Sequence, residues 1–332
     1  MKKFIKNIIY FLLPITCIVT ALLSLYYIAD PYDDFKVKEN YSWKFRFQKL
    51  GDLSTKKLMH TTQHYNSFVL GSSRSCGVYA CYLEQKIPHS KFYHYANWNE
   101  TIGGIEQKLK LALKQGHDLK NVVIYIDNDC TFLKKGKVRT TDHYLLTKQN
   151  RIKYVLKHLL FFFKNLDADL IKILLGMGHN ITDAPFWNSD LNTNDVNHIC
   201  NDSIKASYGV VLKDKAHLTK VDSLLALNIL YKRPTTQQYN QPKISANEKK
   251  SLQEIKALFD KHNTQYYIVL TPLYNQEKIS TVDLEILKSY FGDGLYDFSG
   301  INAFTNNAYN YVDKEHFQPY VSKSILDSII KH

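Results

Sequence analysis

The sequence has little cysteine: five residues in 332, at spacings that match no zinc-binding pattern. No metal or cofactor site is therefore predicted. If the chain is exported from the cytoplasm of a Gram-negative cell, four of its five cysteines face an oxidising compartment. These four are Cys76, Cys81, Cys130 and Cys200. One or two disulfides and free buried thiols are both compatible with this pattern.

Low-complexity tracts are also absent, and 45% of the residues are hydrophobic, a composition typical of a globular protein. A chain of this length can bury one substantial core with a subsidiary lobe. The 24 tyrosines and 17 phenylalanines favour a sheet-rich core over a sugar-facing cleft. A net charge of +12 would suggest a nucleic acid as partner, but no nucleic-acid-binding motif accompanies it, and we predict none.

No charged residue occurs between residues 7 and 29. As a helix this run would extend about 34 Å, enough to cross the hydrocarbon core of a bilayer. Three lysines precede it (Lys2, Lys3 and Lys6), which predicts that the N-terminus is cytoplasmic and the rest of the chain periplasmic or extracellular. We therefore expect residues 1–29 to be a single-pass anchor in the cytoplasmic (inner) membrane, with a cleaved signal peptide as the alternative.

After a polar connector at 30–65, apolar runs alternate with helical patterns in two parts of the chain. Such alternation, with β-branched runs of five or six residues, is typical of a parallel sheet covered on both faces. We predict an α/β fold, a three-layer α/β/α sandwich with a flavodoxin-like, mostly parallel five-stranded sheet. The predicted strands are 67–70, 91–96, 121–126, 266–271 and 295–298, and the predicted later helices are 248–262, 281–291 and 319–330.

Between residues 131 and 245 the alternation stops, which predicts a mainly helical insertion in an α/β domain spanning 66–331. Nine lysines and arginines fall between residues 134 and 164, where Asp142 is the only acid. Such a basic face fits anionic lipid head groups or an acidic polysaccharide, and it equally fits a solvated helix surface. The sequence leaves these alternatives open.

The chain is organised around residues 66–75, Asn-Ser-Phe-Val-Leu-Gly-Ser-Ser-Arg-Ser. The apolar run predicts a buried strand that breaks at Gly71, where glycine allows a turn that a side chain would block. Ser73 would then lie at the carboxyl edge of the sheet, where open parallel sheets bind ligands. We predict that Ser73 is a nucleophile, against the alternative of a turn or helix-capping serine.

A serine nucleophile needs a base to take its proton, and Asp313-Lys-Glu-His316 precedes the last predicted helix. A histidine can accept a proton near neutral pH. Asp313, three residues earlier, can hold the other ring nitrogen in the required tautomer. We therefore predict His316 as general base with Asp313 as its partner, although an aspartate there could merely cap the helix.

These blocks resemble the SGNH (GDSL-like) hydrolase superfamily, particularly its membrane-anchored branch with alginate-type O-acetyltransferase domains. The resemblance rests on Gly71-Ser72-Ser73, on Asp313-x-x-His316 before a C-terminal helix and on the lead-in at 297–300. It covers residues 66–130 and 246–331 and does not extend to the insertion. Ser72 stands where the commoner motif of that superfamily has aspartate.

The resemblance also implies oxyanion donors in the middle of the domain. Asn128, after the third predicted strand, matches the position and type of the third block, and Gly103 or Gly104 could supply a backbone N–H. Arg74 and Asn97 are candidates for substrate binding, but for Arg74 we favour a pair with a local carboxylate, for which Asp127 and Asp129 are available.

The expected function is that of a membrane-anchored, extracytoplasmic serine esterase or O-acyltransferase acting on acyl esters of cell-envelope glycans. The alternative is a catalytically inactive SGNH-like module that binds glycan or partners a membrane-bound acyltransferase. The expected partners are therefore the lipid bilayer, through residues 7–29, and an envelope polysaccharide.

Overall fold

In the computed structural model of this chain, the residues described are 1–35, 50–95, 97–133, 137–138, 143–168, 172 and 215–330. The chain forms two compact units. The N-terminal unit joins Met1–Gln48 to Gln149–Ala184, and the sheet unit joins Lys49–Lys148 to Pro185–His332. The predicted insertion is therefore divided between the two units.

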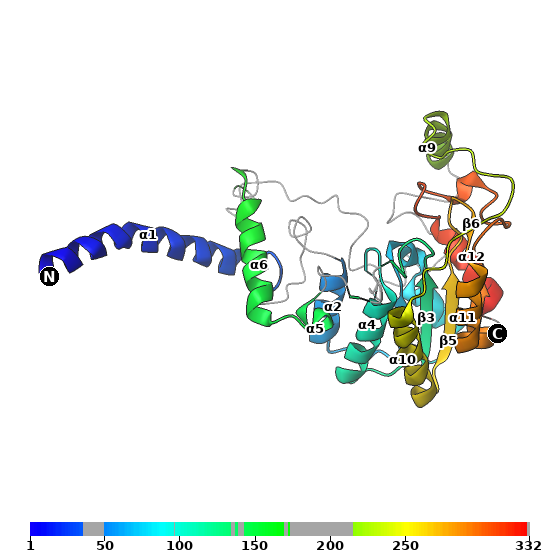
Figure 1. Cartoon of the computed structure of the whole chain (residues 1–332), viewed down its shortest axis with the longest axis horizontal. Helices are drawn as coiled ribbons and strands as arrows, with labels where there is room; N and C mark the ends of the chain where they lie inside the picture. The colour runs from blue at the N-terminus through cyan, green and yellow to red at the C-terminus, as the bar shows by residue number, and fades with distance from the viewer. Residues whose placement is uncertain are drawn as a thin grey trace. The chain divides into compact units, whose positions relative to one another are not determined.

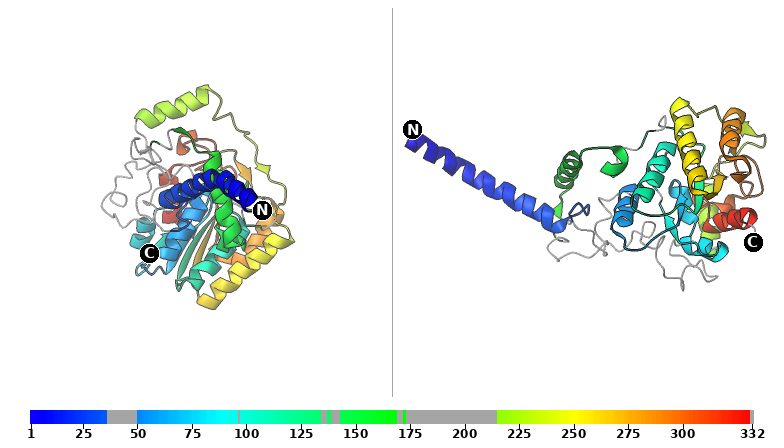
Figure 2. Two further views of the ribbon diagram at one scale, coloured as in Figure 1. Left: turned by 90° about the vertical axis from the view of Figure 1, so that its left-hand side faces the viewer. Right: turned by 90° about the horizontal axis from the view of Figure 1, so that it is seen from below.

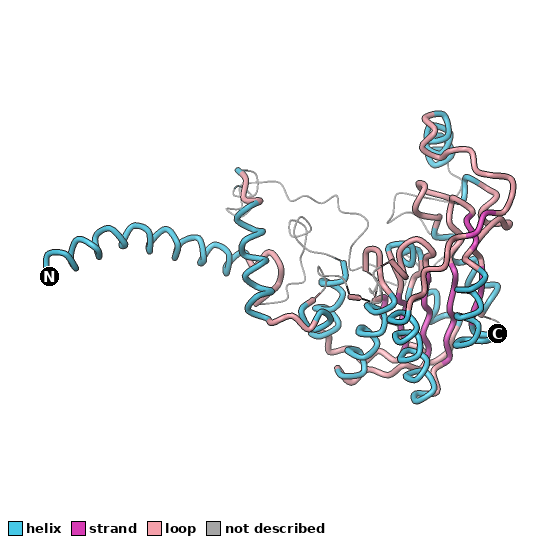
Figure 3. Tube along the Cα trace, in the orientation of Figure 1, coloured by secondary structure: helices cyan, strands magenta, loops and turns pink. Residues whose placement is uncertain are grey.

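The sheet unit is built on a five-stranded sheet in which all neighbouring strands are parallel (Figures 1 and 3). Its order is β2-β1-β3-β5-β7, which is the flavodoxin-like order 2-1-3-4-5 when these strands are counted along the chain. The predicted α/β fold class is confirmed. The strands are β1 Ser67–Leu70, β2 Phe92–His94, β3 Asn121–Ile126, β5 Gln265–Leu270 and β7 Leu295–Asp297.

Helices cover both faces of this sheet, because alternate strand residues point to opposite sides (Figure 2). Val122, Ile124 and Ile126 of β3 pack with α4 (Ile102–Lys114), α10 (Ala246–His262) and α11 (Thr281–Phe291). Val123 and Tyr125 pack with α3 (Ala80–Lys86) and α12 (Pro319–Ile329) on the other face. The three layers place the carboxyl ends of the strands at one open edge.

The predicted connector at 30–65 contains a helix, α2 (Leu50–His60), that belongs to the sheet unit and packs against its core. Leu58 is buried in the core, and Thr55 Oγ1 accepts a hydrogen bond from the Tyr95 hydroxyl at 2.9 Å. The sequence of this helix has few apolar residues at helical spacing, because much of its buried face consists of polar side chains.

The described part of the insertion contains helices and one short strand. The helices are α5 (Tyr144–Thr147), α6 (Arg151–Lys164) and α9 (Lys215–Ala226). The strand β4 (Gln238–Tyr239) pairs in parallel with β6 (Glu277–Lys278). Residues 173–214 of the predicted insertion lie outside the described residues.

The N-terminal unit contains α1 (Lys2–Ala29), whose most apolar 18 residues have a mean hydropathy of 2.4. By length and composition this helix can cross a membrane. The helix ends at Asp30, which takes a left-handed conformation and donates its N–H to the carbonyl of Tyr26. This agrees with an N-terminal membrane segment of the predicted extent.

Candidate active site

The turn after β1 depends on Gly71, whose φ of +152° is one that side-chain-bearing residues rarely adopt. A Cβ at this position would lie 2.9 Å from the Cβ of Tyr125 and 3.0 Å from its carbonyl oxygen. Glycine is therefore required both by the backbone angle and by the close approach of β3.

Two serines follow this glycine with different roles. Ser72 is the N-cap of the short 3₁₀ helix η2 (Ser73–Gly77), and its Oγ accepts the N–H of Arg74 at 3.1 Å. Ser73 is the first residue of η2, where a backbone N–H has no partner within the helix. Ser72 is buried and Ser73 is half-buried, so the hydroxyl that solvent can reach is that of Ser73.

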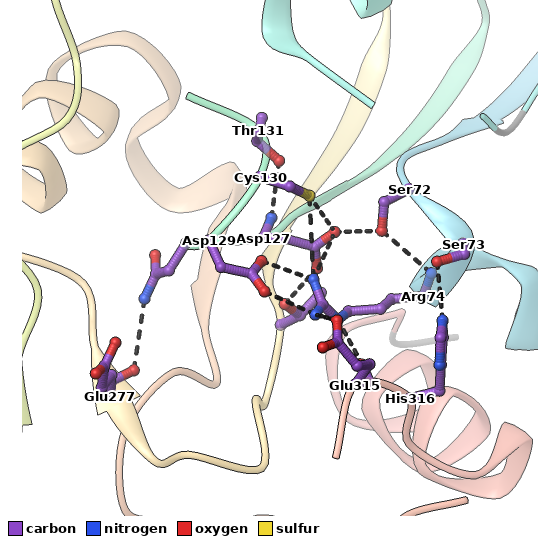
Figure 4. A network of polar contacts seen from close by, with 12 residues as sticks. Ser72, Ser73, Arg74, Asp127, Asp129, Cys130, Thr131, Glu277, Glu315 and His316 are labelled. Atoms are coloured by element: carbon purple, nitrogen blue, oxygen red, sulfur yellow. Dashed lines mark hydrogen bonds and ion pairs between the residues drawn. The ribbon is translucent and has the colours of Figure 1, made fainter. Parts of the chain in front are cut away.

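The structure brings the three predicted catalytic residues together (Figure 4 shows Ser73 and His316). Ser73 Oγ lies 2.9 Å from His316 Nε2, and His316 Nδ1 lies 3.1 Å from each carboxylate oxygen of Asp313. A proton on Nδ1, donated to Asp313, leaves Nε2 free to accept the serine proton. A serine hydroxyl hydrogen-bonded to a histidine, whose other ring nitrogen is hydrogen-bonded to an aspartate, is the arrangement that activates a serine.

Asp313 also closes the loop that carries His316. Its Oδ1 accepts the N–H of Glu315 at 2.7 Å and that of His316 at 2.8 Å. Burial raises the pKa of Asp313, but the hydrogen bond and charge of His316 outweigh it, so this pKa lies below its usual value. Asp313 is therefore a carboxylate that orients both the ring and the backbone of His316.

Arg74 follows Ser73, and its side chain extends toward Asp129 and Glu315, where protein groups accept its N–H donors (Figure 4). Its terminal nitrogens contact the Asp129 carboxylate at 2.7 and 2.8 Å, and its Nε donates to the Glu315 carbonyl at 2.6 Å. Asp127 lies 3.5 Å away and the Glu315 carboxylate 3.3 Å away. This local pairing, which the sequence favoured, leaves the substrate-binding role of Arg74 without support.

Asp127, which directly follows β3, is hydrogen-bonded to the serine turn through Ser72. The fully buried carboxylate accepts hydrogen bonds from the hydroxyls of Ser72 and Thr271, the latter at 2.6 Å. The loop after a neighbouring strand thus brings an acid to the side chain of Ser72. The sequence analysis paired Asp127 only with Arg74, so this contact was not predicted.

The predicted oxyanion glycines lie in the first turn of α4 and are buried. The N–H of Gly104 donates to Thr101 Oγ1 at 3.1 Å, as in a capped helix. A Cβ on Gly104 would lie 2.1 Å from Glu100 Oε1. These contacts show a packing role for Gly104 and give no support to its predicted oxyanion role, and Gly103 beside it is also buried in the helix.

The two candidate asparagines lie in different surroundings. The side-chain amide of Asn128 donates to the Glu277 carbonyl at 3.5 Å, away from the serine turn, so its predicted oxyanion role has no support in these contacts. Asn97 is buried after β2, where its backbone N–H donates to the Gly71 carbonyl at 3.2 Å. Of the two, Asn97 therefore lies beside the turn that carries Ser73.

The described part of the sheet unit includes hollows of very different size. A small one, of about 30 Å³, is lined by Ser73, Arg74, Cys76, Gly77, His316, Phe317 and Pro319. A larger one, of about 680 Å³, is lined in part by Tyr231, Arg233, Tyr274, Gln276 and Asn306. The smaller hollow contains both reactive groups, and its size suits a small acyl group or water more than a long chain.

Other reactive groups near Ser73 are poorly suited to catalysis. Burial raises the pKa of the Cys76 thiol to about 12, so this side chain is not a thiolate at neutral pH. Cys76 and Cys130 are free buried thiols, Cys17 is free and exposed, and Cys81 is disulfide-bonded. Within the described ranges no group of three or more His, Cys, Asp or Glu side chains could hold a metal.

The site is therefore defined by its geometry and by the fold that carries it. No protein-family model matches the chain, and no curated protein is significantly similar to it.

Proposed function

We propose that this protein is a membrane-anchored serine hydrolase or O-acyltransferase of the SGNH type. The observation that carries the proposal is the continuous hydrogen-bonded series from Ser73 Oγ through His316 to Asp313. Its position at the carboxyl end of a parallel sheet, after a glycine turn, adds support.

In the proposed mechanism His316 takes the Ser73 proton while Oγ attacks the carbonyl carbon of an acyl ester. The backbone N–H of Ser73, at the start of η2, is the proposed donor that stabilises the tetrahedral oxyanion. His316 then gives its proton to the departing alcohol, leaving an acyl-serine. A water or sugar hydroxyl, deprotonated by His316, attacks this ester and restores Ser73.

A cell-envelope glycan is proposed as the substrate. The apolar helix α1 supports a membrane location. The larger hollow supports a polymer binding nearby, because its tyrosines and side-chain amides supply the apolar faces and hydrogen bonds found in ligand clefts.

The test uses the full chain in detergent or nanodiscs, with a chromogenic acetyl ester and a serine-directed fluorophosphonate probe. Ser73→Ala should abolish labelling and lower ester hydrolysis by about 10³-fold or more. Ser289→Ala, on the exposed surface of α11, is the matched control and should behave like the parent. Labelling and hydrolysis that persist in Ser73→Ala would exclude this function.

The engagement of Asn128 and Gly104 in other contacts favours a second candidate, a glycan-binding module without catalysis. The two candidates differ in cells, because glycan acylation would be lost with Ser73→Ala if the chain is the enzyme. If the chain is a binding module, acylation would survive Ser73→Ala and fall when Tyr231→Ala alters the larger hollow.

A further inference from the structure

Helix α6 of the N-terminal unit exposes an apolar row that no described residue covers. Ile152, Leu156 and Leu160 follow one another at four-residue spacing, so they form a line along one side of the helix. Their side chains are 70%, 51% and 70% exposed. Single exposed apolar residues are common, but a continuous row of three on one helix calls for a partner.

A row of lysines runs beside this apolar row. Lys153 and Lys157 are each one residue further along the helix than Ile152 and Leu156, and Lys164 continues their line; all three are exposed. Residues 151–164 include no acid. An apolar stripe flanked by cations is typical of helices that lie in a membrane interface, where lysines reach the head groups.

The opposite side of α6 fixes the helix to the end of α1. Phe162 is buried against Tyr26, with ring centroids 5.4 Å apart, in a cluster that includes Tyr32. His158 Nδ1 lies 2.9 Å from the Asp34 carboxylate, which also accepts the hydroxyl of Tyr26 at 2.7 Å. These contacts attach α6 to the last turn of α1 and to the short segment after it.

Within this unit α6 runs across the axis of α1 and not along it, as two perpendicular views show (Figures 1 and 2). If α1 crosses a bilayer, a helix fixed across its end lies along the bilayer surface. Tyr27 and Phe35, exposed near the same end, are residue types that favour the interfacial zone.

We propose that α6 is an interfacial helix that lies on the lipid surface beside the anchor, with Ile152, Leu156 and Leu160 among the acyl chains. Lys153, Lys157 and Lys164 then contact anionic head groups. This inference depends on α1 as an anchor and not on the chemistry of Ser73. The sequence alone left lipid, polysaccharide and solvent as alternatives for this basic segment.

Charge and apolar area together favour lipid over the other occupants. A polysaccharide would neutralise the lysines but leave the apolar row in water. A second copy of α6 would bury the apolar row but bring two lysine rows together, and like charges repel. A membrane with anionic lipid satisfies both rows at once.

The experiment places an environment-sensitive fluorophore (NBD) on Leu156→Cys and Leu160→Cys in the full chain. The background carries Cys17→Ala, and the signal of that background is subtracted. The chain is reconstituted in phosphatidylcholine vesicles with and without phosphatidylglycerol. Val282→Cys in α11 is the matched control, because Val282 is apolar and 51% exposed, as Leu156 is.

We expect quenching by doxyl-labelled lipid to be at least threefold stronger at positions 156 and 160 than at 282, and quenching by aqueous iodide to be weaker. Phosphatidylglycerol should strengthen the lipid contact, and Lys153→Gln with Lys157→Gln and Lys164→Gln should remove that increase. Equal iodide access at all three positions would overturn the proposal. So would protection that rises with protein-to-lipid ratio and is accompanied by cross-links between copies at 156.

Discussion

The guanidinium of Arg74 holds the carboxylate of Asp129 through both terminal nitrogens, at 2.7 and 2.8 Å. The same side chain donates its Nε to the Glu315 carbonyl at 2.6 Å. Asp129 follows β3, whereas Glu315 belongs to the loop before α12. One buried arginine therefore joins the serine turn to the loop that carries the histidine.

The first prediction concerns this arginine. Arg74→Ala leaves the fully buried Asp127 without its neighbouring cation and should lower the free energy of unfolding by about 3 kcal/mol or more. Arg74→Lys keeps the charge but loses the bidentate contact with Asp129. It should therefore lower stability less than Arg74→Ala while still lowering the rate of ester hydrolysis. Urea unfolding and ester hydrolysis measure the two effects.

Lys91→Ala provides the control for Arg74, because its ion pair with Glu84 is partly exposed and should contribute less than about 1 kcal/mol. If Arg74→Lys kept full activity, the arginine would be a structural ion pair without influence on the position of His316.

The second prediction concerns the contact between Ser72 and Asp127. Ser72→Ala removes the N-cap of η2 and a buried hydrogen bond, and should destabilise the protein by about 1–2 kcal/mol. Ser72→Asp should be worse, because two carboxylates would then meet in a buried site. Combining it with Asp127→Ser should recover stability, measured as the midpoint of urea unfolding. No recovery in the double variant would mean that the two side chains are not coupled.

The fold could be predicted from the sequence because the strands are short apolar runs and the helices have apolar residues at helical spacing. The run at 121–126 is β3 to the residue, and the stripe in 248–262 belongs to α10. The strand predicted at 91–96 is shorter in the structure. It spans Phe92–His94, the three residues that pair with β1. Helix α2 was missed because its burial rests on polar contacts that have no periodic signature.

The contacts among Ser73, His316 and Asp313 could be predicted because each residue has a local signal: a glycine turn before Ser73, and Asp-x-x-His before the last helix. The oxyanion candidates depend on where an N–H points, which no spacing reveals. Gly104 illustrates this limit, since its missing side chain makes room for Glu100, a residue that forms a buried ion pair with Lys108.

The third prediction distinguishes these roles at Gly104. Gly104→Ala would place a Cβ 2.1 Å from Glu100 Oε1, so the buried pair must shift, and we expect a loss of about 1–3 kcal/mol in stability. Ester hydrolysis per folded molecule should stay near that of the parent. A fall of 10²-fold or more in the folded variant, without loss of stability, would instead favour an oxyanion role. Gly116→Ala is the control, because open space surrounds that position, although its φ of +85° gives a small cost of its own.

The last prediction is a pH dependence set by His94, whose Nε2 lies 2.8 Å from the Ser75 carbonyl beneath the serine turn. Burial, with a smaller effect of the Lys108 charge, lowers the pKa of His94 to about 4, so the folded protein keeps this ring neutral. The unfolded chain binds the proton near pH 6.5, so stability falls as the pH drops from 6.5 towards 4, by about 3 kcal/mol in all.

Asp313 acts in a different pH window. Its pKa is below the usual 3.8, so its contribution is present above that value and is lost only at lower pH. Urea unfolding between pH 4.5 and 7.5 therefore measures how the free energy of unfolding depends on histidine protonation, without a contribution from Asp313. In His94→Gln, which retains a hydrogen-bond donor for Ser75, the slope of stability against pH should be shallower than in the parent. His117→Gln is the comparison, because burial also lowers the pKa of His117 but that ring lies away from the serine turn, beside Tyr65. An unchanged slope in His94→Gln would show that His94 is protonated in the folded protein and that its burial does not oppose charge.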